Sequence, residues 1–217
     1  MRIRHQPWAK PELAACPYYY KDGSVNRGRW KEVFGNDKPI YAELGCGKGG
    51  FIAEAVMANP DVNWIACDIK DEMLAFARRK TEKLFSDNSR EVKGLVLLTL
   101  NIEKTDTVFA PGEIDRFYIN FCPPWKRERE FKHRLTHPRQ LVSYREILKP
   151  GGEILFKTDD DILFEDSLLY FTECGFETVR IERDLHAAGF SDNIVTEHER
   201  MFAEEGKKIK FVRVIKT

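Results

Sequence analysis

The chain has 217 residues, of which 42% are apolar and 12% aromatic, enough for one domain with a substantial core. Its 35 basic and 35 acidic residues balance, so net charge argues neither for nor against a nucleic-acid partner. The five scattered cysteines form no C-x-x-C pair and no Cys/His cluster with zinc spacing, so we expect reduced thiols, a cytoplasmic protein and no metal site.

Residues 1–38 are predicted to form a basic extension that packs on or flanks a domain over residues 39–217. Residues 1–31 hold seven Lys and Arg against two acids. Arg2 and Arg4 are candidate phosphate contacts, although terminal charge is more often simply solvated. No apolar run approaches the ~18 residues of a membrane span, and no apolar signal-peptide core follows the first basic residues.

Strand and helix patterns alternate along the rest of the chain. The expected strands cover Ile40–Leu44, Asn63–Cys67, Leu95–Leu100, Ile114–Phe121, Glu153–Thr158, Glu177–Ile181 and Ile209–Ile215. The expected helices cover Phe51–Ala58, a segment marked by Met73 to Leu84, Gln140–Leu148, Ile162–Cys174 and a short stretch, Glu197–Glu204, within residues 184–206. This order predicts a doubly wound α/β sheet with helices on both faces, in which ligands bind at the carboxyl ends of the strands.

A glycine-rich loop follows the first of these strands. Gly45-x-Gly47-x-x-Gly50 lets the backbone turn tightly, and Asp68, about 20 residues on, can accept hydrogen bonds from ribose hydroxyls. An NAD enzyme, or a glycine-rich turn without a ligand, fits the same pattern. Glu43 favours S-adenosylmethionine, because a carboxylate at the strand end would attract the methionyl ammonium and would repel a pyrophosphate.

Together with the turn Leu148-Lys149-Pro150-Gly151-Gly152, this half of the chain resembles class I S-adenosylmethionine-dependent methyltransferases. The resemblance implies a Rossmann-like fold. Its sheet is expected to be seven-stranded and mostly parallel, with the last strand antiparallel.

The second half is similar to the bacterial tRNA (guanine-N7)-methyltransferases. The ordered motifs that carry this resemblance are Asn120-Phe121-x-x-Pro124-Trp125, Lys132-x-Arg134-Leu135-Thr136, Lys157-Thr158-Asp159 and Thr196-x-x-Glu199. The resemblance implies methyl transfer to N7 of a guanine in the variable loop of tRNA. We therefore expect tRNA as partner, no membrane association, no obligate protein partner, and a monomer or homodimer.

The same resemblance assigns roles to individual residues. It places Glu43, Gly45, Gly47, Asp68, Asn101 and Asn120 at the cofactor, and Arg127, Asp159, Thr196, His198 and Glu199 at the substrate. The cations Arg129, Lys132 and Arg134 belong to a basic run that we expect to follow the RNA backbone. Plainer readings stay open, because Thr196-x-x-Glu199 is also a helix capping box and Asp159 opens an acidic run that suits a helix start.

One position departs from the family motif. The family has Asn-Phe-Ser-Asp-Pro-Trp-Pro-Lys, whereas this chain has Asn120-Phe121-Cys122-Pro123-Pro124-Trp125-Lys126-Arg127. Pro123 therefore replaces the presumed catalytic aspartate, and Asp159 and Glu199 are the candidate substitutes. The alternatives are a weakened or inactive tRNA-binding protein, and a methyltransferase for another RNA base or a small molecule.

Overall fold

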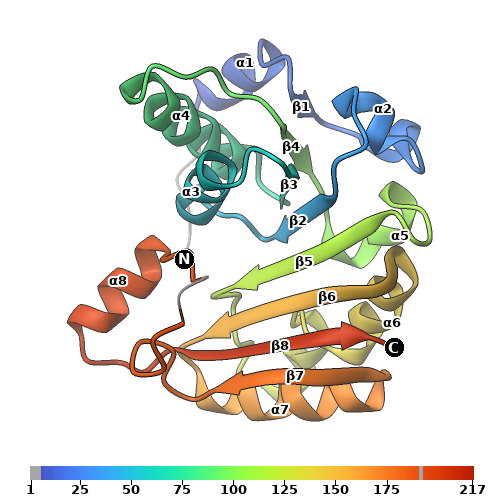
Figure 1. The fold of residues 1–217 in the computed structure, drawn as a ribbon, viewed down its shortest axis with the longest axis vertical. Coiled ribbons are helices and arrows are strands. Elements are labelled where there is room, and N and C mark those ends of the chain that lie inside the picture. Colours follow the sequence, from blue (N-terminus) through green and yellow to red (C-terminus); the bar gives the residue numbers. More distant parts are fainter. Residues whose placement is uncertain (1–5, 191–192) are drawn as a thin grey trace.

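The structure is a computed structural model that describes residues 6–190 and 193–217, and in it one mixed sheet runs through the molecule (Figure 1). Its strands are β1 (Tyr19–Tyr20), β2 (Ile40–Leu44), β3 (Asn63–Asp68), β4 (Leu95–Thr99), β5 (Ile114–Asn120), β6 (Leu148–Thr158), β7 (Phe176–Glu182) and β8 (Lys210–Lys216). They lie in the order β1-β4-β3-β2-β5-β6-β8-β7. Strand β8 runs antiparallel to both of its neighbours, β6 and β7, which confirms the reversed last strand.

The helices cover both faces of the sheet, as predicted. They are α1 (Ala9–Ala14), α2 (Trp30–Phe34), α3 (Gly50–Ala58), α4 (Asp71–Asp87), α5 (Thr105–Val108), α6 (Pro138–Ile147), α7 (Asp161–Glu173) and α8 (Glu197–Glu204), with 3-10 turns η1 (Ser24–Asn26), η2 (Ile102–Lys104) and η3 (Glu128–His133). Helices α1, α3 and α4 close one apolar core over β2–β4, and α6 and α7 close the other (Figure 1). Among the described residues, no helix is long and apolar enough to cross a bilayer.

The predicted count of seven strands is wrong by one, because the N-terminal segment adds β1 to the edge of β4. The described part of this segment packs on the domain. The Trp8 ring meets the Phe76 ring of α4 edge-on with centroids 5.0 Å apart, and Trp30 is fully buried. Arg2 and Arg4 lie outside the described residues.

Strand β6 begins five residues earlier than expected. Leu148 pairs with Ile114 of β5, and the register then shifts, so that Glu153 pairs with Arg116. The Pro150-Gly151-Gly152 turn is therefore a bulge inside the strand, and Gly151 takes a positive φ of 74° there.

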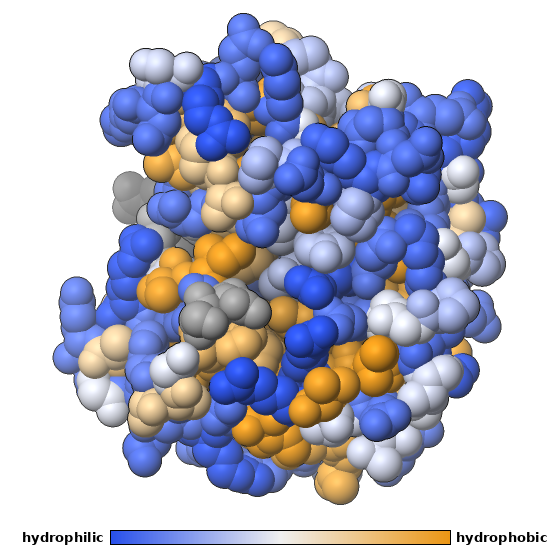
Figure 2. Space-filling model, viewed as in Figure 1, coloured by the Kyte–Doolittle hydropathy of each residue, from blue (hydrophilic) through white to orange (hydrophobic). Residues whose placement is uncertain are grey.

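The two halves of the sheet differ in how they are covered. In Figure 1 the near face of β6, β8 and β7 carries no helix, and Figure 2 shows apolar side chains over these strands. Val179 and Ile181 of β7 are exposed.

The strand order reverses between β2 and β5. The crevice at the carboxyl ends of these two strands is therefore the expected ligand site of a doubly wound sheet.

Candidate active site

The glycine-rich loop joins β2 to α3 and is fastened to the end of β3. The backbone N–H groups of Gly45 and Cys46 both donate to the Cys67 carbonyl at 2.9 Å. The N–H of Gly47 donates to Asp68 Oδ2 at 3.0 Å. The loop and the predicted ribose-binding carboxylate thus form one unit, as the fingerprint requires.

Gly49 is the position at which this loop tolerates no side chain. Its φ is +79°, and a Cβ added there would lie 2.5 Å from Cα and Cβ of Ala77 in α4. The start of α3 therefore touches the α4 backbone directly. At Gly47, by contrast, an added Cβ meets nothing within 4 Å, so that side of the loop faces open space.

Glu43, the residue before the last of β2, is a buried carboxylate with one hydrogen-bond donor. Asn120 Nδ2 donates to Glu43 Oε1 at 3.0 Å. No described group donates to Glu43 Oε2, and Asn120 Oδ1 is also buried without a partner. The pKa of Glu43 is raised to about 7, chiefly by burial and also by nearby Asp68, while the Asn120 hydrogen bond and the Lys157 ammonium act in the opposite direction. Two buried oxygens with no donor are suited to a cationic hydrogen-bond donor.

Asp68 and Asn101 end β3 and follow β4. Besides the bond from Gly47, Asp68 Oδ1 accepts from the Lys70 N–H at 2.9 Å, and burial raises the pKa of its carboxyl. Asn101 accepts from the Glu103 N–H at 3.1 Å and so caps η2. Ile69 is 59% exposed beside Asp68. The sequence did not single out Ile69 as a site residue. An aliphatic residue directly after the acid that ends a strand was the signal that could have found it.

The chain bends sharply after β5 at residues 121–125, called the corner, and Leu135 beyond it packs against the glycine-rich loop. A Cβ added to Gly45 would lie 3.6 Å from Leu135 Cδ2. Phe121 and Trp125 hold positive φ values of 51° and 44°, which non-glycine residues rarely adopt. These two left-handed residues enclose Cys122, Pro123 and Pro124, so a sharp double bend carries the chain around the corner. Pro123 is exposed at its tip.

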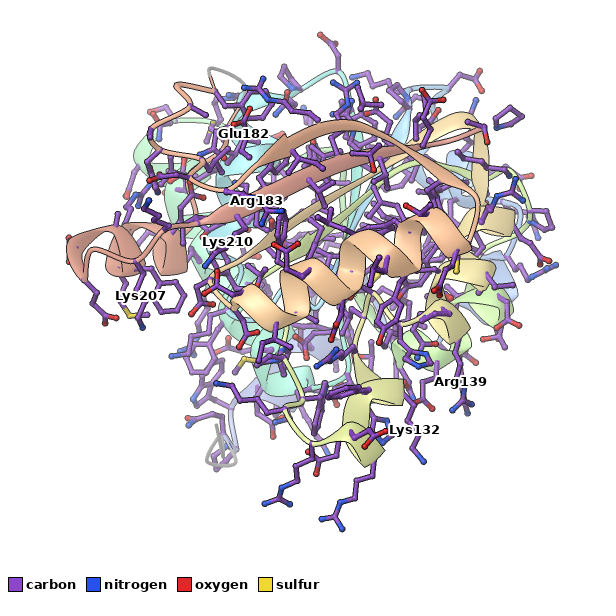
Figure 3. All side chains as sticks on the ribbon, turned by 90° about the horizontal axis from the view of Figure 1, so that it is seen from below. Lys132, Arg139, Glu182, Arg183, Lys207 and Lys210 are labelled. Carbon is purple, nitrogen blue, oxygen red and sulfur yellow. The ribbon has the colours of Figure 1, made fainter. Side chains whose placement is uncertain are left out.

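The basic run after the corner divides into exposed cations and one buried one. Arg127, Arg129 and Lys132 are exposed, and Lys132 extends from the same side of the molecule as Arg139 (Figure 3). Arg127 forms an ion pair with Glu130 at 3.7 Å.

The expectation that Arg134 follows the RNA backbone is corrected. Its side chain is 1% exposed, with Nε donating to the Pro124 carbonyl at 2.8 Å and Nη1 to Asp166 at 2.6 Å. The guanidinium also lies over the Phe131 ring, 3.6 Å from its centroid. Arg134 fastens the corner to α7 instead.

Thr196 and Glu199 form the capping box of α8 and are both buried. The Glu199 N–H donates to Thr196 Oγ1 at 3.0 Å, and the Thr196 N–H donates to Glu199 Oε2 at 3.3 Å. Lys157, at the end of β6, donates to Glu199 Oε2 and to the Ile194 carbonyl, each at 3.0 Å. The sequence motif contained Lys157, but its pairing with Glu199 was not foreseen. The side chain of His198 lies outside the described residues.

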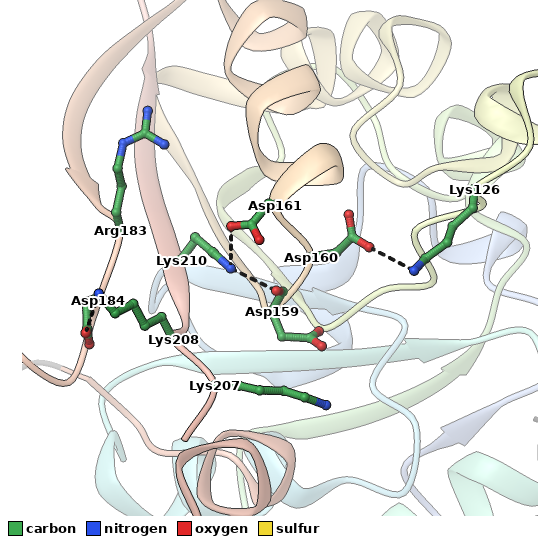
Figure 4. Close-up of a pocket in the computed structure, with 9 residues that line it drawn as sticks. All are labelled: Lys126, Asp159, Asp160, Asp161, Arg183, Asp184, Lys207, Lys208 and Lys210. Carbon is green, nitrogen blue, oxygen red and sulfur yellow. Dashed lines mark hydrogen bonds and ion pairs between the residues drawn. The ribbon is translucent and has the colours of Figure 1, made fainter. Parts of the chain in front are cut away.

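Asp159 lines a pocket of about 710 Å³ at the ends of β6 and β7 (Figure 4). The pocket is lined by Lys126, Asp159, Asp160, Asp161, Arg183, Asp184, Lys207, Lys208 and Lys210. Asp160 accepts from the Leu163 N–H at 2.8 Å as the N-cap of α7, and Lys210 pairs with Asp161 at 2.7 Å. The Asp159 carboxylate has no hydrogen bond or ion pair within residues 6–190 and 193–217, and the dashed line from Lys210 in Figure 4 ends on the Asp159 backbone carbonyl. It is therefore the acid of this run that is available to a ligand.

The pocket also touches the corner. Lys126, the second residue after Pro124, forms an ion pair with Asp160 at 3.7 Å. Asp159 thus lies beside the segment that carries Pro123, whereas Glu199 is held inside the protein by Lys157.

Comparisons with known proteins give a consistent picture. Residues 37–212 match a family model described as "Putative methyltransferase". The chain is 51% identical over 214 residues to a tRNA (guanine-N(7)-)-methyltransferase of Clostridium perfringens (strain SM101 / Type A), covering 98% of each protein. It is 49% identical over 217 residues to a protein of that name from Clostridium beijerinckii, covering 100% of this chain and 99% of the relative. The solved structure of the 16S rRNA methyltransferase KamB matches with a TM-score of 0.63 at 11% identity, over 88% of this chain and 93% of that one, which supports the fold.

Proposed function

This chain belongs to the tRNA (guanine-N7)-methyltransferase family, and we propose that its β2–β5 crevice holds S-adenosylmethionine while the corner and the Asp159 pocket receive a guanine of the tRNA variable loop. The protein is an S-adenosylmethionine-dependent methyltransferase that acts on N7 of guanine in tRNA. The observation that carries the placement of the site is the buried Glu43–Asn120 pair, which has two oxygens without donors beside a glycine-rich loop.

The residues of this crevice fit the cofactor. When bound, S-adenosylmethionine supplies an electrophilic methyl group on a sulfonium sulfur. Glu43 and Asn120 would accept hydrogen bonds from its amino group, and Asp68 would accept them from the ribose hydroxyls. The exposed Ile69 offers an apolar surface for the adenine, with Asn101 at the adenine end. The open side of Gly47 leaves room for the ligand to approach the backbone.

The absence of an acid at Pro123 does not remove the basis of catalysis. Guanine N7 carries a lone pair and no proton, so the site has to hold the base in line with the methyl group rather than to remove a proton. Alignment of this kind accounts for much of the acceleration of such reactions. A carboxylate near the base would orient it and stabilise the positive charge that develops on the ring. Asp159 suits this role better than Glu199, because its carboxylate is free and Glu199 is paired with Lys157.

The exposed cations near the corner are placed to contact the RNA backbone. Arg127, Arg129 and Lys132 lie on the segment that leaves the corner. Binding through them should weaken steeply as salt rises, because each phosphate contact releases counterions. The remaining features of the proposal are a cytoplasmic location and a monomer or homodimer without an obligate protein partner.

The deciding experiment incubates purified protein with tRNA that lacks the modification and with S-adenosylmethionine carrying a labelled methyl group, and then maps the labelled nucleotide. We expect label at N7 of a variable-loop guanine, and at least a hundredfold less in Glu43→Gln, because that variant loses a charge-assisted contact worth about 3 kcal/mol. Label on another base or on a small molecule would contradict the proposed substrate.

A second function is favoured by Pro123 itself. If the missing acid abolishes turnover, the chain would be a tRNA-binding protein with a methyltransferase fold. In that case cofactor and tRNA both bind, yet no label is transferred.

A further inference from the structure

Three polar side chains form a row across one face of the sheet. Glu43 pairs with Tyr118 of β5, and Asn120, two residues on, pairs with Lys157 of β6. Paired residues of parallel strands, and residues two apart in one strand, point to the same face. Glu43, Asn120 and Lys157 therefore follow one another along the carboxyl edge of β2, β5 and β6, and Asn120 donates to Glu43 within this row.

Lys157 lies between two buried carboxylates. Its side chain is 6% exposed and that of Glu199, on the far side of the row from Glu43, is 0% exposed, with Nζ and Oε2 3.0 Å apart. The ammonium also acts on Glu43, whose ionised form it favours. One buried cation therefore interacts with two buried acids, through an ion pair with Glu199 and through its charge with Glu43.

Among the described residues, Glu43 is the acid of this cluster that has no cation of its own. Two carboxylates and one ammonium leave a net negative charge in a buried place, which is costly unless it is compensated. The other groups that face Glu43 do not compensate it, since Asp68 is an acid and Asn120 is neutral. At the other end, Lys157 and Asn193 both donate to Glu199, and His186, whose Nε2 is 3.6 Å from Glu199 Oε1, also lies at that carboxylate rather than at Glu43. The uncompensated charge is therefore at Glu43.

We propose that Glu199 is a positioning residue. By pairing with the Lys157 ammonium, it keeps this cation beside residues 193–199 and away from Glu43, whose carboxylate stays available to the amino group of the cofactor. This inference rests on the proposed function for the identity of that cofactor. Without Glu199, the Lys157 ammonium keeps the Asn193 and Ile194 oxygens as acceptors but loses its carboxylate partner. Glu43 is the other carboxylate on which it acts, so the ammonium would turn to Glu43 and occupy the place of the cofactor amino group. Cofactor affinity then depends on the position of α8, which carries Glu199, although α8 itself does not contact the cofactor.

Isothermal calorimetry with S-adenosylmethionine, on the full chain and without tRNA, tests the coupling. Glu199→Gln should weaken binding about tenfold, because the released ammonium competes for one carboxylate contact. Lys157→Met/Glu199→Gln should bind within about threefold of wild type, since the competing cation is gone. Glu204→Gln, the same change at an exposed position of α8, should bind like wild type.

The double variant separates this role from a purely structural one, because a second core substitution would not repair a misplaced helix. An unchanged affinity in folded Glu199→Gln, or no recovery in the double variant, overturns the inference. If thermal unfolding shows that Glu199→Gln is not folded, the double variant alone decides, and binding more than threefold weaker than wild type overturns it. Wild-type protein that binds no S-adenosylmethionine overturns the proposed function as well, whereas normal wild-type binding with an unaffected Glu199→Gln overturns this inference alone.

Discussion

Asn120 donates a 3.0 Å hydrogen bond to the carboxylate of Glu43, which precedes it by 77 residues in the chain. The bond joins the ends of β2 and β5, the two strands between which the order of the sheet reverses. It satisfies one oxygen of Glu43 and leaves the other, with Asn120 Oδ1, buried and without a donor among the described residues. The crevice is thus prepared for a cation before any ligand arrives.

Cofactor affinity should rise with pH. Because the pKa of Glu43 is raised to about 7, its carboxyl is largely protonated at pH 6 and largely ionised at pH 8. Only the ionised form attracts the amino group, so binding should strengthen over this range and release about half a proton at pH 7. Calorimetry in buffers of different ionisation enthalpy measures this release. Glu43→Gln is the control and should show weak binding without this pH dependence; the same release in that variant would contradict the assignment.

Pro123→Asp should raise turnover. An acid at the corner can orient the guanine and stabilise its developing charge, an effect of about 2–4 kcal/mol, or roughly 30- to 1000-fold in kcat. Pro123→Asn controls for the change in backbone freedom and should give a much smaller gain. Single-turnover methyl transfer to unmodified tRNA measures both. If wild type and Pro123→Asp are equally inactive while the cofactor binds normally, the role assigned to this corner is wrong.

Asp159→Asn should lower kcat about tenfold or more while cofactor affinity stays unchanged. The neutral amide keeps the shape of the side chain and removes the charge that would stabilise the methylated base. Asp161→Asn is the matched control, because Asp161 is exposed and pairs with Lys210 in the same pocket. The comparison needs kcat and KM separately. Equal effects at the two positions would indicate a general loss of negative charge rather than a specific contact.

Much of the fold was predictable because its signals are local. Alternating strands and helices, the glycine-rich loop and the acids at strand ends all lie within short windows of sequence. The structure confirms the doubly wound sheet and its reversed last strand. Strand β1 was missed because a pair of tyrosines is too short to show any period, and it is a strand only through its pairing with β4.

The site was less predictable because residues far away in the sequence determine whether its charged side chains are buried or exposed. Arg134 stands among exposed cations in the sequence, yet Asp166 of α7 and the Pro124 carbonyl bury it. Glu199 was expected to contact the substrate or to cap a helix, yet Lys157, 42 residues earlier, pairs with it inside the protein. Neither partner lies within the window that a sequence pattern covers.

Gly49→Ala should destabilise the fold strongly. The added methyl would lie 2.5 Å from the Ala77 backbone, and the residue would also keep an unfavourable positive φ. We expect a loss of about 3 kcal/mol or more in the free energy of unfolding. Gly47→Ala is the control, since it has a positive φ but open space around it, and should lose about 1–2 kcal/mol. Denaturant unfolding measures both, and equal losses would show that close packing of α3 on α4 is not the cause.

Arg129→Ala/Lys132→Ala should weaken tRNA binding and flatten its salt dependence. Both cations are exposed beside the corner. Removing two phosphate contacts should lower the slope of log affinity against log salt by about 1.5–2. Lys83→Ala is the control, because Lys83 is an exposed lysine of α4 paired with Asp87.

Arg134→Ala should act differently from this double variant. It leaves Asp166 and the Pro124 carbonyl without their partner, so it should cost about 2 kcal/mol of folding stability and leave the salt slope of the folded protein unchanged. Titrations of labelled tRNA at several salt concentrations distinguish these outcomes. A slope that falls in Arg134→Ala, or stays constant in the double variant, would contradict the division of the basic run into a surface part and a buried part.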